Sequence, residues 1–242
     1  MKKMKWMALL LAAAMLTGCG GSEAPVQEEA KQDVQAEEQV EKDEAQQEQA
    51  GVYEEQISAY RTALAEKWEM ESYFERDMSS LAIYYYENNG LENVGYALMD
   101  LDFDGSDELV IGAIEGADTD PVIFELWTLD ASGAPVKLLT SQERNRYYLG
   151  WGEEGVYTVE NQASNGAANF AHHYYTLIDG ALQVQQAIVF DAMTDEENPW
   201  FMAYDEDWDV SNDTPIEEEL AMSIMDSYTK NTIIPDYTPL SE

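Results

Sequence analysis

Residues 100–108 place carboxylates at alternate positions of one short acidic segment. Aspartates at loop positions 1, 3 and 5 direct their oxygens toward a common centre, and a glycine at position 6 permits a sharp bend. An oxygen cage of this kind suits calcium. The candidate ligands are Asp100, Asp102, Asp104, the backbone carbonyl of Ser106 and Glu108, with Gly105 at the bend. We therefore predict one calcium ion as a cofactor. The alternative is a solvated acidic turn, in which crowded carboxylates would repel one another.

The residues around this loop indicate its type. Position 12 holds Ile111, where an EF-hand requires a bidentate glutamate, and the flanking residues 96–99 and 109–111 have the composition of strands. Residues 95–112 instead resemble the calcium loops of FG-GAP and integrin-like repeats, which have a strand-loop-strand pattern with aspartate at positions 1, 3, 5 and 9. The resemblance implies the same ligand set, with Glu108 in place of the ninth-position aspartate. It covers one copy, so the propellers that those families build from several copies are not implied.

The elements that must position this loop follow from hydrophobic periodicity. Short β-rich runs recur at spacings of roughly ten residues over 94–190, separated by turn sequences such as Asn165-Gly166 and Asp179-Gly180. We predict helices before and after these runs. The apolar stripe of the first helix is Tyr53, Ile57, Tyr60, Leu64 and Trp68. A second helical piece is expected over 78–87, closed by Asn88-Asn89-Gly90 with glycine in the left-handed position.

The C-terminal region predicts one more helix. Thr214-Pro215-Ile216-Glu217 combines an N-cap threonine, a proline at the first helical position and a capping-box glutamate. The stripe of that helix is Ile216, Leu220, Ile224 and Tyr228. The predicted fold class is therefore α+β: N-terminal helices, an antiparallel β meander of about seven or eight strands, and a C-terminal helix.

Weaker patterns carry less information. The residues Asp205, Asp207, Asp209, Ser211 and Asp213 repeat the alternation. Val210 replaces the glycine, however, and a β-branched residue resists the left-handed conformation. Asp213 and Thr214 are better interpreted as caps of the last helix, so a second ion site over 205–213 stays open. His172 and His173 are neighbours in an expected strand and face opposite sides, so they cannot chelate one ion together.

Aromatic and acidic side chains leave the ligand undefined. The tryptophans of the last 192 residues are Trp68, Trp127, Trp151, Trp200 and Trp208. Some of them could form a platform that stacks on sugars, although such residues more often belong to the core. Carboxylate pairs for glycoside hydrolysis could be chosen from 39 acidic residues in many ways. No catalytic residue is therefore assigned.

Composition excludes several classes of protein. The chain has 12 basic and 49 acidic residues in 242, a net charge of −37. Such a chain repels phosphate backbones, so nucleic-acid binding through a basic patch is excluded. One cysteine and two histidines exclude internal disulfides, Fe–S clusters and zinc sites built from those residues.

The first residues indicate export. Three lysines precede an apolar run of 11 residues over 6–16, which suits a signal peptide and is too short to span a bilayer. Leu16-Thr17-Gly18-Cys19 matches the lipobox of bacterial lipoprotein precursors. The resemblance implies a signal peptide over 1–18, cleavage before Cys19, and lipidation of Cys19 as a membrane anchor. The alternative is an ordinary secreted protein with a chance cysteine.

Residues 23–50 contain no aromatic residue and no Leu, Ile, Met or Phe. Such a segment cannot bury enough surface to offset its ordering entropy. We predict that residues 19–50 are the lipidated cysteine and a disordered acidic linker, followed by a single globular domain over 51–242.

These expectations lead to two main hypotheses, and a third possibility is a calcium-sensing accessory subunit whose partner would bind in a calcium-dependent way. The first is a lipid-anchored domain on the extracytoplasmic face of the cell membrane, non-enzymatic, with a binding or envelope-associated role and one stabilising calcium ion. Its layout resembles that of small surface lipoproteins of Gram-positive bacteria, which implies no activity. Its protein or glycan ligand is undefined. The second is a secreted hydrolase of envelope polymers or glycans that uses carboxylates, with structural calcium. A cleft with two facing carboxylates would favour the hydrolase, and a shallow aromatic surface would favour binding.

Overall fold

The computed structural model describes residues 50–87, 89–114, 121–152 and 155–242. The chain divides into two units, Met1–Asp43 and Glu44–Glu242, and all the described residues belong to the second. The expected signal peptide, the lipidation site at Cys19 and nearly all of the expected linker therefore lie outside the described residues.

The N-terminal helices form as the apolar spacing predicts. Helix α2 (Glu54–Glu66) is followed by α3 (Met70–Glu75), the 3₁₀ helix η1 (Ser80–Tyr85) and α4 (Gly90–Asn93). Tyr53, Ile57, Tyr60 and Leu64 are buried, so the predicted stripe is confirmed. The helix expected over 78–87 is the short η1, and Asn89, not Gly90, takes the left-handed backbone with φ 51°.

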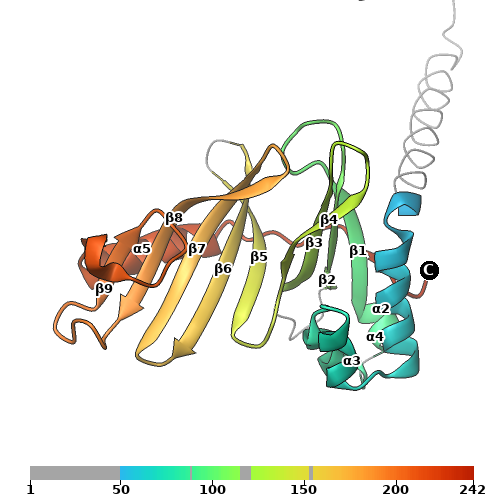
Figure 1. The fold of residues 1–242 in the computed structure, drawn as a ribbon, viewed down its shortest axis with the longest axis horizontal. Coiled ribbons are helices and arrows are strands. Elements are labelled where there is room, and N and C mark those ends of the chain that lie inside the picture. Colours follow the sequence, from blue (N-terminus) through green and yellow to red (C-terminus); the bar gives the residue numbers. More distant parts are fainter. Residues whose placement is uncertain (1–49, 88, 115–120, 153–154) are drawn as a thin grey trace, which may run out of the picture. The chain divides into compact units, whose positions relative to one another are not determined.

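One antiparallel sheet of 11 strands forms the rest of the unit (Figure 1). The path through it runs β10-β9-β8-β7-β6-β5-β3-β2-β1-β11, and β4 pairs with β3 outside this path. The strands are β1 (Val94–Met99), β2 (Glu108–Ala113), β3 (Ile123–Leu129), β4 (Pro135–Thr140), β5 (Asn145–Trp151), β6 (Tyr157–Gly166), β7 (Asn169–Ile178), β8 (Ala181–Asp191), β9 (Trp200–Ala203), β10 (Thr214–Pro215) and β11 (Thr238–Pro239).

The mixed helix and sheet class and the C-terminal helix are confirmed, but the predicted count of about seven or eight strands is too low. The strands beyond the expected β-rich run are β9, β10 and β11. Two of these are two-residue strands. Strands so short have no detectable alternation, and their pairing is fixed by the neighbouring strand instead.

The C-terminal helix begins later than predicted. Thr214 and Pro215 are strand residues that pair with Met202 and Phe201 of β9, so neither they nor Asp213 cap the helix. Helix α5 (Glu218–Thr229) starts after Glu217. Three residues of the predicted stripe, Ile216, Ile224 and Tyr228, pack against the cluster that includes the buried Ala221, whereas Leu220 is 48% exposed. The rings of Tyr228 and Tyr174 stack with their centroids 3.5 Å apart.

The sheet has two halves with a narrow joint. Strands β3 and β5 share a single register pair, Ile123 with Tyr147, whereas β6 and β7 pair over nearly their whole length. Figure 1 shows α2, α3 and α4 near β1–β3 and α5 near β8 and β9. Between these groups, a cluster of buried residues from both halves, including Val110 and Val159, packs across the joint.

Candidate functional site

The expected calcium loop is the connection between β1 and β2. The two strands pair from Val94 with Ala113 to Met99 with Glu108, so residues 100–107 form the turn of a hairpin. Gly105 has φ 92°, which confirms its predicted role at the bend. The Tyr53 hydroxyl beside α2 donates a hydrogen bond of 3.0 Å to the carbonyl oxygen of Asp107. The loop is thereby joined to the N-terminal helices.

Phe103 also takes a left-handed backbone, with φ 61°, which is unfavourable for a bulky residue. Its ring stacks on Tyr157, with centroids 5.8 Å apart and planes 20° apart, and lies edge-on to Trp151 at 6.4 Å. These contacts join the tip of the loop to β5 and β6 and offset part of the backbone cost.

Asp100, Asp102 and Asp104 each use one carboxylate oxygen to hold the backbone of the loop. Asp100 Oδ2 accepts from the Gly105 N–H at 3.1 Å, and Asp102 Oδ1 accepts from the Asp104 N–H at 3.2 Å. Asp104 Oδ1 accepts from the Ser106 N–H at 2.7 Å. The loop is therefore folded by its own carboxylates, which leaves their other oxygens for a ligand.

Glu108 lies beneath the loop and is 2% exposed. Its Oε2 accepts from the Leu101 N–H and its Oε1 from the Thr128 hydroxyl on β3, both at 2.9 Å. Burial raises the pKa of Glu108 to about 7, against the effect of these hydrogen bonds, and the charges of Asp102 and Asp104 raise it further. A cation at this position would favour the charged form of the carboxylate.

Asp100, Asp102 and Glu108 converge, with one oxygen of each within 4.8 Å of the others. Asp100 Oδ1 is buried and accepts no hydrogen bond, which leaves a lone pair available at the site. Asp104 is not part of this carboxylate cluster. The structure thus brings together three of the four predicted carboxylate ligands, and this all-oxygen donor set fits a hard cation such as calcium.

The second aspartate series forms similar turns, but its carboxylates are not among the converging group. Asp205, Asp207 and Asp209 each accept, through Oδ1, the N–H two residues ahead, at 3.3, 2.8 and 3.1 Å. Their carboxylates are exposed, while Val210 between them and the sheet is buried. The alternation therefore builds a chain of Asx turns that presents the intervening side chains, Glu206 and Trp208, to the sheet.

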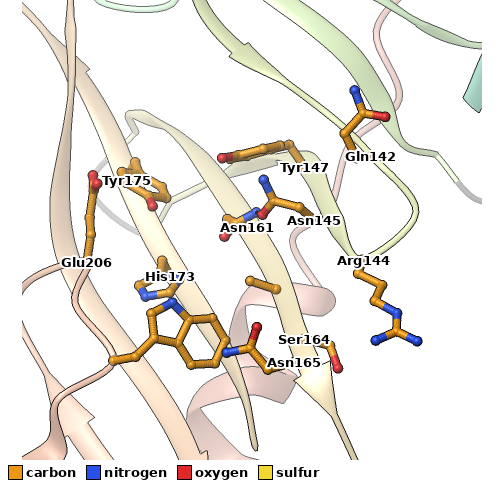
Figure 2. A pocket seen from close by; sticks show the side chains of 12 residues that line it. Gln142, Arg144, Asn145, Tyr147, Asn161, Ser164, Asn165, His173, Tyr175 and Glu206 are labelled. Atoms are coloured by element: carbon orange, nitrogen blue, oxygen red, sulfur yellow. The ribbon is translucent and has the colours of Figure 1, made fainter. Parts of the chain in front are cut away.

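Those side chains border a cleft of about 600 Å³ on β5, β6 and β7 (Figure 2). His173 lines this cleft, whereas His172 lines a smaller hollow of about 290 Å³ and its Nδ1 lies 2.7 Å from Glu160 Oε1. The prediction that the two histidines face opposite sides agrees with this separation.

Sequence reasoning missed most residues of the cleft. Of its lining, the sequence indicates Trp208 as a candidate for sugar stacking and His173 as an ordinary strand residue, and it assigns no role to Tyr147 or Asn161. No local pattern in the sequence marks this cleft, because its lining residues come together through the register of neighbouring strands. The role of Thr128 as a partner of Glu108 was also missed, because 20 residues separate the two.

Searches for a matching family model, a similar curated protein or a similar solved structure found no match. No helix among the described residues is long and apolar enough to cross a membrane.

Proposed function

We propose that this protein is a lipid-anchored domain on the extracytoplasmic face of the cell membrane, with a non-enzymatic binding role and one calcium ion in the β1–β2 loop. The observation that carries the calcium proposal is the convergence of Asp100, Asp102 and Glu108 within 4.8 Å. The buried Asp100 Oδ1, which has no hydrogen-bond partner, supports it. The ion would be held by these carboxylates, with Asp104 and the Ser106 carbonyl close by in the loop.

The chemistry of the site indicates a structural ion. The loop joins two strands of a sheet, and its carboxylates also accept hydrogen bonds from the loop backbone. Calcium would neutralise the repulsion among these groups and hold the hairpin closed. Magnesium suits the site less, because it requires near-ideal octahedral geometry and loses its water reluctantly.

The lining of the cleft favours a binding role over hydrolysis. Hydrolysis of a glycan by the usual route uses two carboxyl groups flanking the scissile bond. Glu206 is the one carboxylate among the residues that line the cleft.

Calorimetry on the purified protein tests the calcium proposal. After thorough chelation we expect a saturable heat with calcium and a much weaker one with magnesium. The double variant Asp100→Asn/Asp102→Asn should lose the calcium heat, since it removes two of the three converging carboxylates. No saturable calcium heat in the wild-type protein would contradict the proposal.

Fractionation of cells tests the anchor. The sequence Leu16-Thr17-Gly18-Cys19 supports it, and replacement of Cys19 by Ala should move the protein from the membrane fraction to soluble or unprocessed forms. If Cys19→Ala fractionates like the wild type, the anchor proposal is wrong.

A further inference from the structure

The cleft on β5, β6 and β7 is distinct from the calcium loop. Its lining comes from Asn145 and Tyr147 near the start of β5, whereas the calcium loop contacts Trp151 at the end of that strand. Six residue steps along a strand separate the two ends of β5, about 20 Å. The volume of about 600 Å³ lies within the range of small-molecule sites.

The floor of the cleft is a row of side chains on three neighbouring strands. Tyr147 is the register partner of Asn161, and Asn161 is the partner of His173. In the next row, Ala163 lies between Asn145 and Ala171. Because side chains on directly opposite positions share a face, the small side chain of Ala163, which lines the cleft, leaves depth beside the larger polar groups.

One wall of the cleft is the segment that follows β9. Asx turns at Asp205 and Asp207 fix its backbone. Val210 is buried with Ala171 and Ala187 in a small core that Trp208 also contacts. Trp208 lies edge-on to His173, with ring centroids 6.2 Å apart. Figure 2 shows Glu206 approaching from this side, opposite Asn145 and Asn161.

His173 is the observation that points to a ligand. The residue is 3% exposed, and neither Nδ1 nor Nε2 has a hydrogen-bond partner. A neutral imidazole carries one donor and one acceptor, and leaving both unpaired in a buried position is unfavourable. A ligand with groups that both donate and accept would satisfy them.

The remaining lining defines the chemistry of that ligand. Carboxamides predominate, from Gln142, Asn145, Asn161 and Asn165, and aromatic rings come from Tyr147, Tyr175 and Trp208. Arg144 and Glu206 are the charged residues of the lining, so their charges cancel. The last 192 residues carry 39 acidic and 7 basic side chains, and this charge disfavours a polyanion.

We propose that this cleft binds a neutral saccharide. A sugar ring has an apolar face for an aromatic side chain and hydroxyl groups that both donate and accept, matching the carboxamides and His173. A peptide strand is less suited, because β6 and β7 are paired on both sides and offer no free edge for strand addition. The proposal names the ligand of the binding role given above and rests on that role, but not on the calcium ion.

Calorimetry and tryptophan fluorescence on the purified full protein test the proposal. The probes are three neutral tetrasaccharides, of glucose, mannose and N-acetylglucosamine, with tetragalacturonate as a charged saccharide and tetraalanine as a peptide. We expect at least one neutral tetrasaccharide to bind, and tetragalacturonate to bind at least about tenfold more weakly or not at all. Binding should also change the tryptophan fluorescence through Trp208.

Two variants locate the site by different means. Trp208→Ala removes an aromatic face and should weaken binding by about tenfold. Ala163→Leu adds a side chain to the floor of the cleft and should block binding while leaving the other lining residues in place. Trp151→Ala is the matched control, since Trp151 is an exposed tryptophan at the other end of β5, and it should bind like the wild type.

Three results would overturn the proposal. No binding of any neutral tetrasaccharide up to about 10 mM would do so, as would binding of tetraalanine alone, which would identify a peptide site. Unchanged affinity in both Trp208→Ala and Ala163→Leu would place the sugar elsewhere. The wild-type protein should bind sugar equally in chelator and in calcium, so a failure of the calcium proposal would leave sugar binding intact.

Discussion

Replacement of Asp100 by Asn should change the stability of the protein in opposite directions without and with calcium. In the chelated protein at pH 8, above the Glu108 pKa of about 7, the charge of Asp100 faces those of Asp102 and Glu108, with oxygens within 4.8 Å. Two unit charges at that distance repel by about 0.9 kcal/mol in bulk water and by about 3.5 kcal/mol at an effective dielectric constant of 20. The substitution removes two such pairs.

The net gain is smaller than this repulsion. Asn keeps an oxygen for the Gly105 N–H, but the hydrogen bond that Asp100 Oδ2 accepts at 3.1 Å loses its charge, which costs about 1 kcal/mol. Taking the value for bulk water, we expect Asp100→Asn to stabilise the chelated protein by about 1 kcal/mol. For a domain of this size, this is a rise of about 2–4 °C in melting temperature.

Calcium should reverse the order. At a hundredfold excess over its dissociation constant, an ion that binds only the folded protein adds about 2.7 kcal/mol, or about 5–10 °C. The wild type should gain this shift and Asp100→Asn should lose most of it. The two melting curves, recorded in chelator and in calcium, should therefore exchange their order.

Asp207→Asn is the control for this experiment. Asp207 is exposed and accepts the Asp209 N–H at 2.8 Å in a similar turn, but it is not among the converging carboxylates. The melting temperature of Asp207→Asn should differ from that of the wild type by less than about 2 °C, both in chelator and in calcium. An Asp100→Asn variant with the full calcium shift of the wild type would refute the role assigned to Asp100.

Three further predictions concern the rest of the chain. Burial lowers the pKa of His173, as does the nearby His172, against the charge of Asp205, with Glu206 also lining the cleft. Below the ordinary pKa of about 6.5 the unfolded chain binds a proton that the folded protein does not, so stability should fall as the pH falls. Urea titrations at pH 7.5 and 5.5 measure this fall in the free energy of unfolding, and it should be smaller in His173→Asn than in the wild type. An equal fall in the two proteins would show that His173 is not its source. Lys137→Met should lower the free energy of unfolding in urea by about 3 kcal/mol, because Lys137 Nζ lies 3.3 Å from the buried Glu125 carboxylate. Adding Glu125→Gln to this variant should restore part of the lost stability. If Lys137→Met is as stable as the wild type, the ion pair contributes nothing. Limited proteolysis should cut within residues 23–50 before it cuts the domain, whereas first cuts within the strands would show that the boundary is misplaced.

The elements with a strong local pattern could be predicted from the sequence. The stripe that includes Tyr53, Ile57 and Tyr60 predicts the first helix, because apolar residues three and four positions apart fit the period of a helix and not the two-residue period of a strand. The turn Asp179-Gly180 gave the β7–β8 hairpin, where both residues have positive φ. The start of α5 could not be predicted, because pairing with β9 holds Thr214 and Pro215 in a strand and overrides their capping propensity.

The two sites differ in the same way. The calcium loop is local: its ligands lie within nine residues, so their convergence could be expected from spacing, although only the structure shows that Asp104 lies outside the cluster. The cleft is not local. Tyr147, Asn161 and His173 meet through the register of three strands, and strand register cannot be read from one sequence.

The narrow joint between β3 and β5 bears on how the protein would respond to force. In an anchored protein, a pull on a ligand in the cleft would pass from β5–β7 to the N-terminal half through the short chain segment between β4 and β5, the one pair Ile123 with Tyr147 and the apolar cluster around it. A second route exists: the Ile233 N–H donates to the Leu149 carbonyl in β5, and Thr238 pairs with Tyr96 of β1. The C-terminal segment therefore also connects the two halves of the sheet, across the contact between β3 and β5. Under tension we expect this contact to separate first, while each half keeps its own hydrogen-bonded strands.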